Sequence, residues 1–121
     1  MRRLRPAVLL TVLLAGCSSS PAARPTTAGC SSPAAGTVTV TTGLRDGRAD
    51  PAPHRVAVPL NSPVVVRVAA DTEAEVHVHG YDLEAEATPD RPGCVAFVAD
   101  RSGLFDVEAH PETLLVQLEV R

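Results

Sequence analysis

The sequence predicts an all-β domain, either a sandwich or a small barrel, from three observations. After residue 36 the β-branched residues Val and Thr are frequent and often alternate with other residues, as strands require. Turn-forming Gly, Pro, Asn and Asp recur about every eight to twelve residues, which is typical of short antiparallel strands. No segment keeps the apolar period of a helix. These patterns favour about eight short strands around one core.

Three strands are expected in the first half of this domain. Residues 37–42 alternate Val with Thr, and residues 55–60 carry apolar side chains on one face. Residues 64–69 form a nearly continuous apolar run in which Arg67 is the only charged residue. The intervening residues 43–54 are rich in Gly, Asp and Pro, so we expect a loop or an irregular edge there.

Two strands in the middle of the domain carry the candidate functional residues. In residues 75–81, EVHVHGY, the two valines face one way, while His77, His79 and Tyr81 face the other. Residues 83–87, LEAEA, continue with both glutamates on the solvated side. The sequence therefore predicts two histidines on one face of a strand.

Three further strands complete the predicted domain. Residues 94–99, 105–109 and 114–120 alternate apolar side chains with others, and Val and Leu predominate on the apolar faces. Turns are expected from composition at residues 89–93 and 100–103. The resulting core is aliphatic, with Phe97, Phe105 and, as the alternative to its outward position, Tyr81 as its only aromatic side chains.

Residues 1–16 have the features of a signal peptide. Arginines precede an apolar stretch, residues 6–14, which is too short to cross a hydrocarbon core of about 30 Å as a helix. The sequence LAGC at residues 14–17 resembles the lipobox of bacterial lipoproteins, which implies diacylglycerol transfer to Cys17, cleavage before it and acylation of its new amine. We therefore expect a lipid anchor in the cell membrane, on the extracytoplasmic side. An ordinary secretory signal is the alternative.

Residues 17–36 are predicted to be a tether. They are almost entirely Ser, Pro, Ala, Thr and Gly, without a large apolar side chain that could offset the entropy of ordering. Such a segment lets a domain stand some tens of ångströms from a membrane surface. Residues 37–121 are then sufficient for one small domain.

The charge of the mature chain excludes some classes of partner. After Gly16 there are fourteen Asp and Glu against eight Arg, which gives a net charge of −6 when the amine of Cys17 is acylated, and the sequence has no lysine. An acidic domain without a basic patch argues against binding to nucleic acid or to anionic lipid headgroups. The expected partners are the membrane, through the lipid anchor, and an unidentified protein of the cell envelope.

Two cysteines remain once Cys17 carries lipid. Cys30 lies in the tether and Cys94 in the domain. An extracytoplasmic location permits a disulfide between them, but the sequence also allows two free thiols.

Three segments resemble the cupredoxin-like domains of secreted bacterial proteins: VHVHGYDL at 76–83, FVADRSGLFDVEAH at 97–110 and LLVQLEVR at 114–121. The resemblance implies an eight-stranded Greek-key β-sandwich with a blue copper at one end. In that family the first copper ligand is a His, which matches His79. The loop between the last two strands supplies a Cys, a His and a weak axial Met.

The sequence departs from this family at the positions of two copper ligands, the Cys and the Met. Ala109 occupies the position of the family's Cys ligand, and the only Met is Met1, which is removed with the signal peptide. Residues 110–113 also form a shortened ligand loop. Because thiolate and imidazoles together suit a redox-active copper ion, we do not expect a blue-copper electron carrier.

The histidines suggest a different metal site. His77 and His79 are two residues apart, so on a strand they lie on one face at about 7 Å. The resemblance places His110 in the ligand loop, beside His79. The three imidazoles, with Glu112 as an oxygen donor, form a candidate site for Cu(II) or Zn(II). The alternative is a metal-free sandwich without a cofactor, in which His79 serves packing.

Catalysis has no support in the sequence. No nucleophile elbow and no glycine-rich phosphate loop occur, so we do not expect an enzyme. The leading hypothesis is a membrane-anchored lipoprotein whose cupredoxin-like domain is a binding or accessory module. The alternatives are copper or zinc handling through the histidines, and an immunoglobulin-like interaction module.

Overall fold

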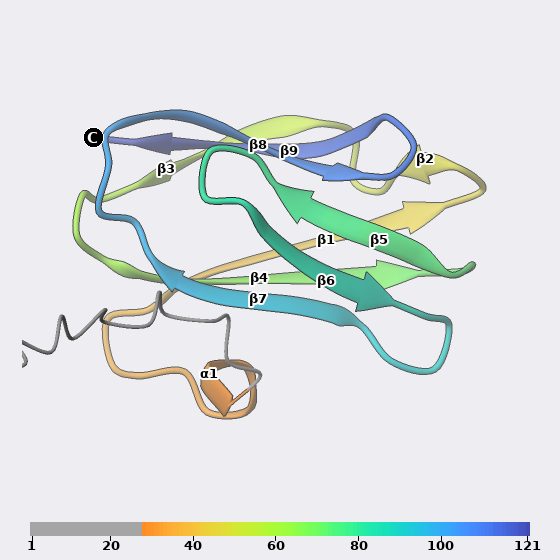
Figure 1. Ribbon diagram of the computed structural model, residues 1–121, viewed down its shortest axis with the longest axis horizontal. Helices are drawn as coiled ribbons and strands as arrows, with labels where there is room; N and C mark the ends of the chain where they lie inside the picture. The colour runs from red at the N-terminus through yellow and green to blue at the C-terminus, as the bar shows by residue number, and fades with distance from the viewer. Residues whose placement is uncertain (1–27) are drawn as a thin grey trace, which may run out of the picture.

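The computed structural model describes residues 28–121, and these residues form a sandwich of two β-sheets (Figure 1). In this part of the chain, one short helix, α1 (Ala28–Ser31), precedes nine strands. The strands are β1 (Val38–Arg45), β2 (Arg48–Ala49), β3 (His54–Val58), β4 (Pro63–Ala70), β5 (Ala74–Val78), β6 (Leu83–Ala87), β7 (Gly93–Val98), β8 (Gly103–Ala109) and β9 (Thr113–Val120). The predicted all-β sandwich is confirmed, with nine strands where eight were expected.

The chain passes repeatedly from one sheet to the other. The four-stranded sheet has the order β2-β1-β4-β7, and the five-stranded sheet has the order β3-β9-β8-β5-β6. Because of these crossings β1 runs parallel to β4, and β3 runs parallel to β9. The other strand pairs are antiparallel.

The core between the sheets is aliphatic, as the alternating valines predict. The largest fully buried side chains of the described residues are Leu115, Leu118, Val58, Val64, Val66, Val68, Val76, Val78, Val95, Val107, Val116 and Val120. Burying one such side chain contributes about 1.5–3 kcal/mol to folding. Successive side chains of a strand point to opposite faces, so on β5 the burial of Val76 and Val78 turns Glu75 and His77 outward.

The additional strand is β2, which lies in the stretch expected to be a loop or an irregular edge. It pairs with the end of β1, with Leu44 opposite Ala49 and Arg45 opposite Arg48. Asp46 and Gly47 connect the two strands, with φ angles of 49° and 71°. Positive φ at both central residues is typical of a two-residue hairpin turn, for which Asp-Gly is a favoured sequence.

Tyr81 does not share the outward face of His77 and His79, so that expectation is wrong, and its alternative place in the core beside Phe97 and Phe105 is confirmed. Strand β5 ends at Val78, and Gly80 turns the chain with a φ of 82°. Beyond this turn Tyr81 packs against the core, and its ring centroid lies 4.7 Å from those of both Phe97 and Phe105. The change of backbone direction at Gly80 reverses the alternation of the strand.

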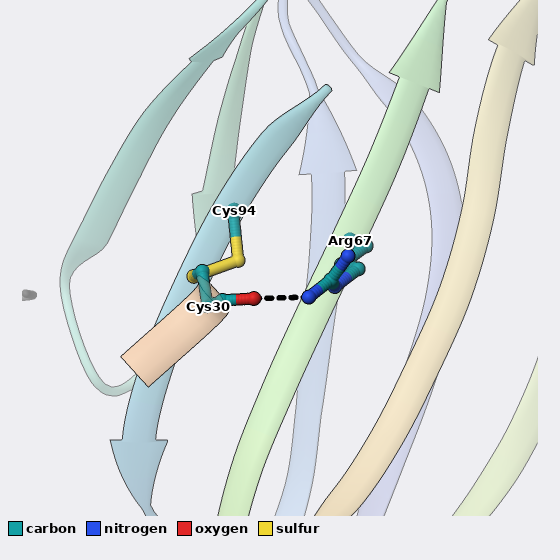
Figure 2. The surroundings of a disulfide bond; sticks show 3 residues. All are labelled: Cys30, Arg67 and Cys94. Atoms are coloured by element: carbon teal, nitrogen blue, oxygen red, sulfur yellow. Dashed lines mark hydrogen bonds between the residues drawn. A yellow bond between two sulfur atoms is a disulfide. The ribbon is translucent and has the colours of Figure 1, made fainter. Parts of the chain in front are cut away.

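A disulfide joins Cys30 to Cys94, which settles the alternatives left open by the sequence. Their Cα atoms are 6.2 Å apart (Figure 2). Arg67, which pairs with Cys94 across β4 and β7, donates a hydrogen bond from Nη2 to the carbonyl oxygen of Cys30. Helix α1 is therefore held against β4 and β7, on the outer face of the four-stranded sheet.

The predicted signal peptide and Cys17 lie outside the described residues. Within residues 28–121, no helix has the length and apolar character needed to cross a membrane.

Candidate site on the outer face of the five-stranded sheet

Three adjacent strands, β6, β5 and β8, place ionisable side chains on the outer face of the five-stranded sheet. On β5, Val76 and Val78 are buried, so Glu75 and His77 point outward. On β8, Val107 and Ala109 are buried, and Asp106 and Glu108 take the outward positions.

Strand pairing arranges these side chains in a grid. His77 stands between Glu84 of β6 and Glu108 of β8. Glu75 is paired with Glu86. We call the following nine side chains the ionisable face: Glu75, His77, His79, Asp82, Glu84, Glu86, Asp106, Glu108 and His110. They comprise six carboxylates and three imidazoles, without an Arg or Lys.

Backbone hydrogen bonds extend the grid beyond the ends of β5. The amide of His79 donates to the carbonyl oxygen of Asp106 at 2.9 Å, and the amide of His110 donates to that of Glu75 at 2.9 Å. His79 and His110 therefore lie at opposite ends of β5. The expectation that His79 lies beside the loop at His110 is wrong, because the antiparallel register puts Asp106 there.

His77 connects the two outer imidazoles into a row. Its ring centroid lies 4.3 Å from that of His79, with the ring planes tilted by 57°. The centroid of His110 is 6.0 Å away on the other side, and its ring is stacked at 23°. The His77 side chain is 17% exposed, whereas those of His79 and His110 are each 47% exposed.

Each imidazole has a carboxylate neighbour. Nε2 of His79 is 2.8 Å from Oε2 of Glu108, which is a hydrogen-bond distance. Nε2 of His110 lies 3.4 Å from Oε1 of Glu75. Nε2 of His77 lies 3.9 Å from Oδ1 of Asp82. Histidine and carboxylate side chains are thus interleaved across the ionisable face.

The carboxylates of this face were not predicted as site residues. Their alternation with apolar residues in LEAEA and FDVEA indicated a solvated sheet face. It did not indicate that β6, β5 and β8 lie side by side, because strand order is a property of the tertiary fold. Glu112 is not among the nine residues. It instead lines a shallow hollow together with Arg48, Pro53 and other residues around β2.

The assignment of His77, His79 and His110 to a metal site stays a prediction. In the side-chain positions of residues 28–121, no three His, Cys, Asp or Glu residues are arranged to hold a metal ion. The structure brings the three imidazoles into one row, but it does not direct all three toward one point.

The blue-copper ligands implied by the sequence resemblance do not fit this domain. Ala109 is fully buried, with Val76 opposite it on β5, so apolar side chains occupy this position. Cys30 and Cys94 are the only cysteines after Cys17, and both are in the disulfide. Met1 is the only methionine of the chain. Within residues 28–121, neither a thiolate nor a thioether is therefore available to copper.

The comparison with known proteins rests on structure. No protein-family model matches the chain. No curated protein sequence matches it either.

Copper proteins are among the solved structures that resemble this chain. One is the solution NMR structure of a copper-binding protein in its apo form, with a TM-score of 0.56, 11% identity and coverage of 71% of this chain and 89% of that one. Another is auracyanin A, a blue copper protein from Chloroflexus aurantiacus, with a TM-score of 0.54, 16% identity and coverage of 71% and 100%. A third is a chain of a heme-copper terminal oxidase, with a TM-score of 0.53, 16% identity and 70% of this chain covered. The present chain spans 64% of that oxidase chain. At these identities the likeness shows the fold alone.

Proposed function

We propose, from the cupredoxin-like fold of residues 28–121, that this protein is a membrane-anchored binding or accessory module on the extracytoplasmic side. In this proposal it is neither an enzyme nor a blue-copper electron carrier. The observation that argues against a blue-copper centre is the disulfide between Cys30 and Cys94, which leaves neither sulfur as a thiolate. A blue-copper centre requires a thiolate ligand, and Ala109 offers only a methyl group where the resemblance implies that ligand.

The absence of a copper–thiolate bond has a spectroscopic consequence. We expect the purified protein, mixed with one equivalent of Cu(II) without reductant, to lack the intense blue absorption of a copper–thiolate centre. Auracyanin A, a blue copper protein of similar fold, is the matched positive control. An intense blue band in the present protein would contradict the proposal.

Anchoring is tested at Cys17. We expect Cys17→Ser to abolish lipid attachment, because the sulfur atom of Cys17 accepts the diacylglycerol. The protein should then move from the membrane fraction to the soluble extracytoplasmic fraction. Immunoblotting of separated fractions measures this shift. Cys30→Ser is the matched control, since it removes another cysteine of the N-terminal segment and should leave membrane association intact. A Cys17→Ser protein that remained in the membrane fraction would refute the anchor.

The immunoglobulin-like alternative receives less support. The amide of His110 donates a hydrogen bond to the carbonyl oxygen of Glu75, so the start of β5, at the other end from His79, lies beside the loop that precedes the last strand. This neighbourhood and the structural likeness to auracyanin A both favour the cupredoxin-like arrangement.

A second candidate function is the binding of Cu(II) or Zn(II) through His77, His79 and His110. The row of three imidazoles around His77 favours it, because imidazole is a common ligand of both ions. We expect isothermal titration of the purified protein with ZnCl₂, and separately with CuSO₄, to show binding at micromolar concentrations or below. His77→Ala, which removes the central ring, should weaken it strongly. Titrations without binding would eliminate this function.

A further inference from the structure

We infer that the ionisable face has a more specific metal site, in which His77, His79 and Glu108 bind one divalent transition-metal ion and His110 stays outside the set of ligands. This inference rests on the second candidate function. It replaces a row of three imidazoles with two imidazoles from β5 and one carboxylate from β8. Glu108 has no role in the metal site expected from the sequence.

The contact between His79 and Glu108 already has nearly the dimensions of a metal site. Nε2 of His79 and Oε2 of Glu108 are 2.8 Å apart. Two ligand atoms that each lie about 2.0–2.1 Å from a tetrahedral Zn(II) are about 3.4 Å from one another. The pair must therefore separate by only about half an ångström to admit the ion between its members.

His77 is placed to supply the third ligand. It alternates with His79 on the outward side of β5, and it is paired with Glu108 across the strands. The centroids of the two rings are 4.3 Å apart, close to the roughly 5 Å expected for two imidazoles on one ion. Because the ring planes are tilted by 57°, lone pairs that lie in these planes can point toward a shared position.

The geometry excludes His110 from the same set of ligands. Its ring is stacked on that of His77 at 23°, with 6.0 Å between the centroids. Lone pairs in two nearly parallel planes do not converge between the rings. His110 also lies at the other end of β5 from His79, because its amide donates to the carbonyl oxygen of Glu75, whereas that of His79 donates to Asp106.

The remaining changes concern side chains on a fixed backbone. The three donors do not yet converge in residues 28–121. The His79 and Glu108 side chains are 47% and 29% exposed, so they can rotate without disturbing the core. The backbone positions of Glu108 and His77 are set by the pairing of β5 with β8. We therefore expect closure of the site to change side-chain torsion angles of His77, His79 and Glu108 while the pairing of β5 with β8 is kept.

The surroundings favour a cation of this class. Two imidazoles and a carboxylate form a ligand set that suits Zn(II) and Cu(II) and leaves a coordination position for water. Glu84 stands across from His77, and Glu75 and Glu86 are paired beside it. Like charges directly opposite one another destabilise a sheet, and a bound divalent cation reduces that repulsion.

Isothermal titration of the purified full chain with ZnCl₂ tests the set of ligands, with Glu108→Gln as the decisive variant. The substitution keeps the shape of the side chain and removes the charged oxygen ligand, so we expect an affinity loss of about tenfold or more. Glu119→Gln is the matched control, because Glu119 also points outward from this sheet, on β9, and its side chain is 33% exposed. It should change the affinity by less than about twofold.

His110→Gln distinguishes the failure of this inference from the failure of metal binding itself. A smaller loss for His110→Gln than for Glu108→Gln supports the proposed ligands. If His110→Gln loses more affinity than Glu108→Gln, the proposed ligands are wrong, while metal binding by the three histidines stands. If the wild-type protein binds neither ZnCl₂ nor CuSO₄, both this inference and the second candidate function are overturned. Circular dichroism of each variant verifies that it is folded.

Discussion

Gly80 controls the direction of the chain beside the ionisable face. Its φ of 82° lies in the left-handed region, where a side chain is strained. A Cβ atom added to it would lie 2.6 Å from Cδ1 of Phe105. Gly80 thus ends β5, turns Tyr81 into the aromatic cluster and leaves His79 on the outer surface.

The first stability prediction concerns this residue. We expect Gly80→Ala to lower the free energy of unfolding by about 2–4 kcal/mol, because left-handed strain and the clash with the Phe105 ring add together. Urea denaturation followed by circular dichroism measures the loss.

Gly47→Ala is the control for Gly80→Ala. Gly47 has a similar φ of 71°, but no atom would lie within 4 Å of an added Cβ. Gly47→Ala should lower the free energy of unfolding only by the cost of the left-handed backbone, about 1–2 kcal/mol. Equal losses for the two variants would show that contact with Phe105 has no energetic role.

At the level of the strands, the sequence predicts which side of a strand faces the core. It does not predict which strands lie next to each other in a sheet. The alternation of Val76 and Val78 with polar residues is local, so it reports directly which side of β5 is buried. The partners of His79 depend on which strand lies beside β5 and in which register. That pairing is tertiary, and it placed Asp106 where the loop at His110 was expected.

Strand β2 is a different case, because its signal is present in the sequence. Asp46-Gly47 is a favoured hairpin turn. The Pro and Asp residues that follow this turn indicated a loop or an irregular edge for residues 43–54. A strand of two residues is too short to show alternation, so the turn sequence was the only local indication of it.

In the candidate site, too, local features could be predicted and features that depend on strand pairing could not. The outward positions of His77 and His79 follow from alternation on one strand. The closeness of Glu108 to His79 could not be predicted, because it requires the pairing of β5 with β8. The sequence cannot decide between a disulfide and two free thiols for a similar reason, since Cys30 lies in a segment of low complexity without a structural pattern.

For the whole molecule, the disulfide is the link between the N-terminal segment and the sandwich. Cys30 and Cys94 are 64 residues apart in sequence. Closing a loop of this length restricts the unfolded chain, which stabilises the folded state by about 4 kcal/mol in the chain-entropy estimate. Arg67 adds a hydrogen bond to the carbonyl oxygen of Cys30.

Reduction should therefore weaken the domain without changing its fold. We expect a reductant to lower the free energy of unfolding by about 4 kcal/mol, with the circular dichroism spectrum of a β-sandwich retained. Urea denaturation with and without reductant measures this difference. The double variant Cys30→Ala, Cys94→Ala should have the stability of the reduced wild-type protein, both with and without reductant. A wild-type stability unaffected by confirmed reduction would contradict the estimate.

The position of the disulfide also determines where mechanical force enters the domain. A pull on the chain before Cys30 reaches the sandwich through the sulfur bridge at Cys94 on β7, and it bypasses the residues that lead into β1. Strand β1, which pairs with both β2 and β4, is then not the first strand that the force reaches. After reduction the same pull acts on β1 first. An intact disulfide thus makes β7, in the four-stranded sheet, the first strand to receive the force, whereas the ionisable face belongs to the five-stranded sheet.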